Sequence, residues 1–169
     1  MAHTDNPLTP VRHGRRSRQR GNAMLEGALA LPPLLMILFA TIDFSIAILV
    51  KNTVQSAVRE GVRYAVTGQT VGALGQDESI RTVVENNSLG FLNSSNGDSL
   101  IAINYYNPNT LAQVNGVGSN AAGNIVKVQV TGLSWAWMVP YARSSTPLQI
   151  SATSMDIVEP TSTGIPPPR

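Results

Sequence analysis

The sequence has no cysteine and only two histidines, and both absences exclude whole classes of functional site. Without cysteine, the 169-residue chain cannot form a disulfide scaffold, a thiol nucleophile or a cysteine-ligated metal site. Both histidines, His3 and His13, precede residue 22. A domain further along the chain therefore has no imidazole for a catalytic triad or for acid–base chemistry near neutral pH. We expect no catalytic residues, no metal site and no cofactor.

Charged residues are also scarce, and they are unevenly placed. Only 13% of the residues are charged, and five of the twelve basic ones are arginines in residues 1–21 (Arg12, Arg15, Arg16, Arg18 and Arg20). A nucleic-acid-binding domain would carry its basic residues on a folded face, interleaved with aromatic residues. We therefore expect no nucleic acid partner, and we interpret residues 1–21 as a disordered basic leader.

A long apolar run follows the arginines. Between Asn22 and Val50 the only charged residues are Glu26 and Asp43. Ala23–Ile42 would span about 30 Å as a helix, which is the thickness of a bilayer core. The arginines before it favour a cytoplasmic N-terminus. This pattern predicts one transmembrane helix over residues 22–50, with a lipid bilayer as its partner and the rest of the chain outside the cytoplasm.

The apolar pattern changes after Val50. Apolar residues then recur at three- and four-residue spacing, which predicts that the helix continues as an amphipathic extension over residues 51–67. This stripe consists of Val50, Val54, Ala57, Val58, Gly61 and Ala65. Arg59, Glu60 and Arg63 lie off the stripe, and we interpret them as a solvated face that could become a partner interface. Gly68 is the expected stop.

Residues 68–159 predict a small α+β domain. Asp77 and Glu78 begin a short helix with an apolar face of Ile80, Val83, Val84 and Leu89, ending at Gly90. Strands are expected over residues 99–106, 124–131 and 148–158, and a phase slip near Ser154 indicates a bulge or a strand end. The asparagine-rich stretch between residues 86 and 124 favours loops. The proline-rich tail, 160–169, should be extended.

These elements predict one architecture. The long N-terminal helix should pack its outer half on a small antiparallel sheet of three or four strands, because little else in the chain could cover either apolar surface.

Glu26 and Asp43 interrupt the apolar run. A charged carboxylate in hydrocarbon costs about 3 kcal/mol and is normally paired. Glu26 could pair with Arg20 or with a new amino terminus made by cleavage after Gly21, or it could lie hydrated and idle. Asp43 lies about 25 Å further along the helix. We interpret Asp43 as a solvated acid at the outer interface, with a contact to a partner helix as the alternative.

Two further features lie in or near the membrane segment. Pro32 and Pro33 remove two amide donors from the helix, which indicates either a hinge or a static kink. Trp135 and Trp137, with Met138 and Tyr141, form the main aromatic concentration. Such residues favour interfaces with protein or with lipid headgroups, although core packing is the common alternative.

The residues around Gly21 resemble a known signal. An arginine-rich leader, Gly21, and then Asn22-Ala23-Met24-Leu25-Glu26 resemble the type IV prepilin signal. The continuation through Leu29–Pro32, Ile42-Asp43-Phe44 and Ala57–Ala65 resembles the TadE-like proteins, which are minor pseudopilins of the tight-adherence (Flp) pilus system. Two residues depart from the pattern, because Asn22 replaces an apolar residue and Gly27 replaces an aromatic one.

The resemblance implies a pilin-like, non-enzymatic protein that a prepilin peptidase cuts between Gly21 and Asn22. It also implies a single-pass protein of the bacterial inner membrane with a periplasmic C-terminal domain, and it leaves open whether the protein enters the pilus. The implied partners are the peptidase, the pilin, related minor pseudopilins and membrane platform proteins.

Two other interpretations of the sequence stand beside this one. The first is an uncleaved single-pass anchor that carries an extracytoplasmic binding domain. The second is an enzyme whose cleft would use acids such as Asp77, Glu78 and Glu85, although these residues fit a helix start and its solvated face better.

Overall fold

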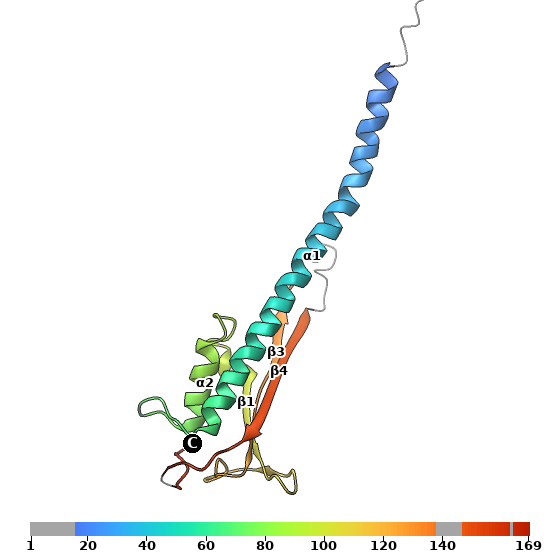
Figure 1. The fold of residues 1–169 in the computed structure, drawn as a ribbon. Helices are drawn as coiled ribbons and strands as arrows, with labels where there is room; N and C mark the ends of the chain where they lie inside the picture. Colours follow the sequence, from blue (N-terminus) through green and yellow to red (C-terminus); the bar gives the residue numbers. More distant parts are fainter. Residues whose placement is uncertain (1–15, 138–146, 163) are drawn as a thin grey trace, which may run out of the picture. The chain divides into compact units, whose positions relative to one another are not determined.

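The computed structural model describes residues 16–137, 147–162 and 164–169, with side chains from residue 21 onward (Figure 1). The elements are α1 (Arg16–Val66), α2 (Gln76–Asn86), α3 (Gly97–Leu100), β1 (Ile101–Tyr106), β2 (Gln113–Val114), β3 (Ile125–Trp135) and β4 (Leu148–Ile157). The chain divides into two compact units, the first ending at Thr41 and the second comprising Ile42–Arg169. The predicted α+β class, with a long N-terminal helix and an antiparallel sheet, is confirmed.

The described part of the first unit is helical throughout. The helix passes Pro32 and Pro33 without interruption, and the large apolar side chains from Met24 to Phe39 are exposed. Among the described residues, one helical stretch, Gly21–Val66, is long and apolar enough to cross a membrane. This arrangement fits a single-pass membrane protein.

The leader differs in part from its prediction. Residues 16–21, which we expected to be disordered, belong to α1, and residues 1–15 lie outside the described residues. Extending an existing helix requires no new nucleation, and arginine and glutamine are good helix formers. The apolar segment therefore propagates its helix back into the basic residues.

The second unit is built around a four-stranded antiparallel sheet in the order β2-β1-β3-β4. Val126, Val128 and Val130 alternate along β3 and are fully buried, as their spacing predicts. The predicted stripe of α1 is buried in the same core, together with Val62 and Val66. Gln55 of α1 also donates a hydrogen bond from Nε2 to the carbonyl oxygen of Thr153 in β4, at 3.0 Å.

Gly61 is the point of closest approach between α1 and α2. A Cβ atom built on Gly61 would lie 2.4 Å from Cγ2 of Val84 and 3.6 Å from Cγ2 of Ile80. Both α2 side chains are fully buried. The two helices can therefore pack at this distance only because residue 61 has no side chain.

The predicted irregularity in the last strand is wrong in position. The register shift falls between Val130 and Leu133 of β3, where Thr131 and Gly132 supply one residue more than the facing segment of β4. Gly132 has φ +83°, a conformation that favours glycine. β4 keeps its phase past Ser154, so Met155 and Ile157 lie on the outer face and are exposed.

The segment after α2 also differs from its prediction. The helix ends at Asn86, and Leu89 is 77% exposed with φ +54°, so Leu89 is not part of the apolar face of α2. Besides the predicted strand, β1, the stretch between residues 86 and 124 contains α3 and β2 where loops were expected. The α3 turn and the two-residue β2 are too short to leave a periodic pattern.

We predict that Gly61→Ala lowers the free energy of unfolding by about 1–3 kcal/mol, because the added methyl group overpacks the contact with Val84. Thermal unfolding of the full chain in detergent micelles measures this change. Gly27→Ala is the matched control, since a Cβ at Gly27 meets nothing within 4 Å and alanine favours helix. Equal melting temperatures for the two variants would contradict the close-approach explanation.

Candidate functional site

The predicted cleavage site lies on an open stretch of α1. Gly21 and Asn22 are exposed within the helix, and a Cβ atom at Gly21 would meet nothing within 4 Å. Glu26 is exposed as well, and among the described residues no basic side chain forms an ion pair with it. Within the described part of the first unit, both the Gly21–Asn22 bond and the Glu26 carboxylate are therefore exposed.

Asp43 is not the solvated acid that we expected. Its exposed fraction is 0%, and it takes part in a polar interaction within the structure. Asp43 lies in the compact second unit, which begins at Ile42, and its side chain faces the interior of that unit. A buried carboxylate requires hydrogen-bonding or charged partners, which water would otherwise supply.

Arg59, Glu60 and Arg63 form an exposed face of α1, as expected. A shallow depression of about 290 Å³ lies between α1 and α2, and it is lined by Glu60, Arg63, Tyr64, Thr67, Gln69 and Val83. No ion pair joins these three described charged residues. Their charges are therefore available to other molecules.

The two tryptophans lie where the sheet meets α1. Trp135 is the last residue of β3, and its indole Nε1 is buried without a hydrogen-bond acceptor in the part of the chain that the structure describes. The Trp137 ring lies 5.8 Å, centroid to centroid, from the ring of Phe44 on α1. Met138 and Tyr141 lie outside the described residues.

A polar cluster that the sequence analysis missed joins the last residue of the chain to α2 and β1. Arg169 donates hydrogen bonds from Nε (2.9 Å) and Nη2 (2.6 Å) to Oδ2 of Asp77. Its guanidinium also lies 4.7 Å from the centroid of the Tyr105 ring, and the Tyr105 hydroxyl donates to Oδ1 of Asp77 at 3.0 Å. Burial and the Asp77 charge raise the pKa of Tyr105 well above its usual value.

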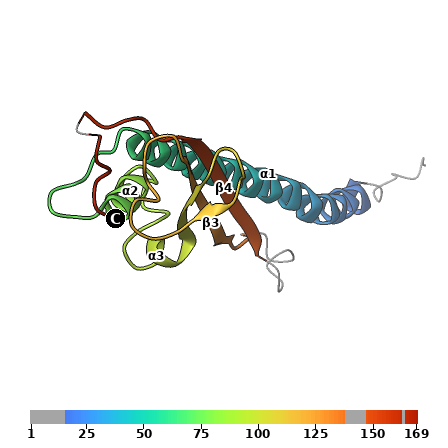
Figure 2. The ribbon, with the colours of Figure 1, turned by 90° about the horizontal axis from the view of Figure 1, so that it is seen from below.

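Backbone and amide contacts hold the rest of the C-terminal segment, which lies beside α2 (Figure 1 and Figure 2). The amide nitrogen of Gln76 donates to the carbonyl oxygen of Pro168 at 2.7 Å, and Nδ2 of Asn120 donates to that of Pro167 at 2.8 Å. Nε2 of Gln76 in turn donates to the carbonyl oxygen of Ala65 at 3.0 Å. The partners in these hydrogen bonds lie far apart in the sequence, so no local sequence pattern predicts the bonds.

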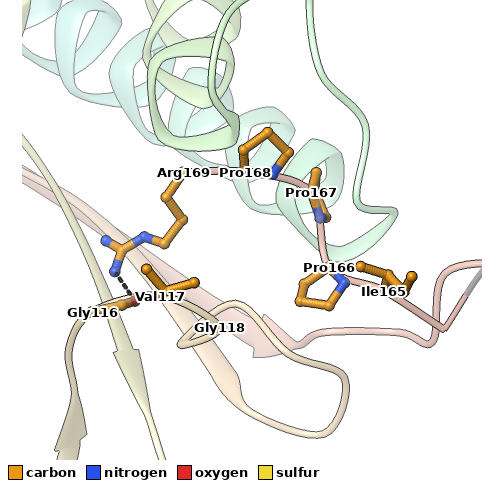
Figure 3. A pocket seen from close by; sticks show the side chains of 8 residues that line it. All are labelled: Gly116, Val117, Gly118, Ile165, Pro166, Pro167, Pro168 and Arg169. Atoms are coloured by element: carbon orange, nitrogen blue, oxygen red, sulfur yellow. Dashed lines mark hydrogen bonds between the residues drawn. The ribbon is translucent and has the colours of Figure 1, made fainter.

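The C-terminal segment also forms one wall of a groove of about 540 Å³ (Figure 3). The facing wall is the loop at Gly116, Val117 and Gly118, and Arg169 donates a hydrogen bond from Nη1 to the Gly116 carbonyl oxygen at 3.3 Å. The lining is otherwise apolar, from Ile165 and three prolines.

The acids considered for an enzyme do not gather in a cleft. Asp77 is occupied by Arg169, and Glu78 pairs with Arg81 at 3.3 Å on the same helix. Burial and the Asp98 charge raise the pKa of Glu85. In the described ranges, no group of three or more potential ligands could hold a metal ion.

Comparison with known proteins bears on the segment that contains the predicted cleavage site. Residues 21–63 match the TadE-like protein family. The match begins at Gly21, includes Glu26 and Asp43, and confirms the resemblance drawn from the sequence. Neither the curated proteins nor the solved structures contain a match. The TadE-like match implies a role in the tight-adherence pilus system, whose TadE-like components are typically structural and associate with other pilus components.

We predict that Arg169→Ala lowers the free energy of unfolding by about 1–3 kcal/mol, because it removes charge-assisted hydrogen bonds and leaves Asp77 partly buried and unpaired. Arg81→Ala is the control, since its exposed i,i+3 pair with Glu78 should contribute only about 0.2–0.5 kcal/mol. Denaturant unfolding of the full chain in micelles compares the two. If Arg169→Ala costs no more than Arg81→Ala, the cluster does not hold the C-terminal segment in place.

Proposed function

We propose that the chain is a minor pseudopilin that supports assembly of the tight-adherence pilus after a prepilin peptidase cuts between Gly21 and Asn22. One observation carries this proposal. The family match starts at Gly21, and five residues later the apolar helix contains an exposed Glu26 that pairs with no basic side chain among the described residues. The proposed location is the inner membrane, with the second unit on the periplasmic side.

Cleavage after Gly21 would lower the electrostatic cost of placing Glu26 in the membrane. A carboxylate in the hydrocarbon region costs about 3 kcal/mol unless it is paired. Cleavage after Gly21 creates an α-ammonium group on Asn22, about 6 Å along the axis from Glu26 on the same helix. It also places Glu26 near a new helix N-terminus, whose dipole favours negative charge. The amine of this helix or of a neighbouring helix can then neutralise Glu26.

The prolines fit the step in which the helix leaves the bilayer. The carbonyl groups of Ala28 and Leu29 lose the amide donors that residues 32 and 33 would normally supply. The helix can bend at this point at little further cost. Pro32 and Pro33 therefore act as a hinge for the first ten residues of the processed chain when they enter a new helical environment.

Two surfaces of α1, one apolar and one charged, are the proposed contacts with partner proteins. The apolar side chains of α1 that lipid covers in the membrane can be covered by the helices of the pilin or of related minor pseudopilins. Arg59, Glu60 and Arg63 offer a charged face to a platform protein or to another pseudopilin.

We predict that Gly21→Leu abolishes processing in cells that contain an active prepilin peptidase, because a side chain would block the peptide from its active site. Mass spectrometry of the membrane-extracted protein should show a chain starting at Asn22 for the original sequence and an uncut chain for the variant. The added side chain has open space in the structure, so misfolding would not explain the result. An uncut original sequence would instead favour a single-pass anchor with a binding domain.

We predict that Glu26→Gln is inserted and cut normally but fails to support piliation, because its amide cannot neutralise the new amine. Surface pili counted by electron microscopy, and pilus components co-isolated from membranes, measure the loss. Gly27→Ala changes the adjacent position without a steric conflict and should leave both at the original level. Normal piliation with Glu26→Gln would refute the pairing mechanism.

A further inference from the structure

In the described part of the β3–β4 strand pair, the charged side chains lie near one end. The polar cluster of Arg169 and Asp77 lies at the end where α1 stops, and Glu159 donates its amide hydrogen to the carbonyl oxygen of Val66 there. Lys127 and Asp156 lie on the strands near this end. In contrast, residues 130–137 and 147–153, which form the other end of the β3–β4 pair, include no charged residue.

The opposite end of the strand pair is aromatic and packs against α1. Phe44 and Trp137 form a ring pair with an interplanar angle of 46°. Trp135 precedes Trp137 by two residues, its Nε1 is buried, and its ring packs against the core of the domain. We call Phe44, Trp135 and Trp137 the aromatic end of the domain.

The surface of α1 beside the aromatic end stays apolar. Phe44 is 61% exposed, Ile48 55% and Leu49 57%, although all three lie inside the compact second unit. Asp43 is buried, so the first exposed charge after the membrane segment is Lys51. Water is therefore a poor solvent for the helix surface between these two residues.

The length of the apolar run indicates where this surface lies relative to a bilayer. Ala23–Ile42 already spans a core of about 30 Å, but the apolar run continues to Val50 and measures about 42 Å as a helix. The excess of about 12 Å exceeds one headgroup layer by only a few ångströms. Phe44 then lies just outside the hydrocarbon, and Lys51 extends its ammonium group to the aqueous side.

We propose that the aromatic end rests in the headgroup layer of the outer leaflet and fixes the height of the folded domain above the hydrocarbon. The occupant of this surface is the phospholipid interface, where tryptophan rings are enriched in membrane proteins. We expect the tryptophan rings to bind the interface itself, so the interaction should not require anionic lipid. This inference rests on the membrane insertion in the proposed function, and it is independent of cleavage and pilus assembly.

Tryptophan fluorescence tests the proposal directly, because Trp135 and Trp137 are the only tryptophans in the chain. The full chain is reconstituted into phosphatidylcholine vesicles, with and without phosphatidylglycerol, as Trp135→Phe or Trp137→Phe. Nitroxide quenchers are attached to the lipid headgroup, to a shallow acyl position or near the bilayer centre, and iodide quenches from water. Flotation of the vesicles reports insertion separately.

In Trp135→Phe, the remaining Trp137 should be quenched several-fold more by the headgroup and shallow nitroxides than by the central one, and it should be shielded from iodide. The result should be the same with both lipid compositions. Trp135, observed in Trp137→Phe, should be quenched less by lipid because its ring is sheltered. Phe44→Asp should reduce lipid quenching of Trp137 several-fold, whereas Leu89→Asp, at an exposed position after α2, should not.

Three results would overturn the proposal. Strong iodide quenching of Trp137 without lipid quenching, in a chain that floats with the vesicles, would place the aromatic end in water or against a protein partner, and would leave cleavage and pilus assembly untouched. A chain that does not float would remove the membrane basis of both this inference and the proposed function. A requirement for anionic lipid would show that charge, and not the interface, attracts the domain.

Discussion

The distribution of apolar side chains around α1 is the constraint on which the rest of the structure depends. Up to Phe39 large apolar residues are exposed on all faces, and from Val50 the buried residues form a single stripe. A helix with an apolar stripe is marginal in water on its own and gains stability by packing that stripe. β1, β3, β4 and α2 supply this cover, and their buried residues form one core with the stripe. The same helix thereby combines a surface suited to lipid with one suited to a protein core.

Small residues on α1 determine how closely α2 can pack against it. Gly61 leaves room for the side chains of Val84 and Ile80 of α2. Ala57 and Ala65 are small buried side chains on the same part of the stripe. The C-terminal segment holds the N-terminal end of α2 through Gln76, Asp77 and Arg169. The Arg169–Asp77 cluster thus lies at one end of the domain, and the Phe44–Trp137 ring pair lies at the other.

Sequence predictions that rest on local periodicity were correct, and those that depend on contacts between distant residues were wrong or missing. The stripe of α1 and the valines of β3 were predicted correctly, because their periodicity is local and long enough to be clear. The phase of β4 was wrong, because the facing residues of β3 and the bulge at Gly132 set its register. The exposure of Asp43 was wrong as well, since nothing near it in sequence shows that the compact unit begins one residue earlier. The Arg169–Asp77 cluster joins residues 92 positions apart and had no local signal.

The sequence by itself determined the membrane-length helix, the change to a one-sided stripe, the absence of cysteine and the spacing from Gly21 to Glu26, because all of these are properties of one chain segment or of composition. Only the tertiary structure decided which strand residues face the core, that Asp43 is buried, and that Trp137 meets Phe44 while Arg169 meets Asp77. These outcomes depend on which distant segments pack together. Side-chain volume, cross-strand pairing and the need to satisfy buried polar groups act on those contacts only after the chain has folded.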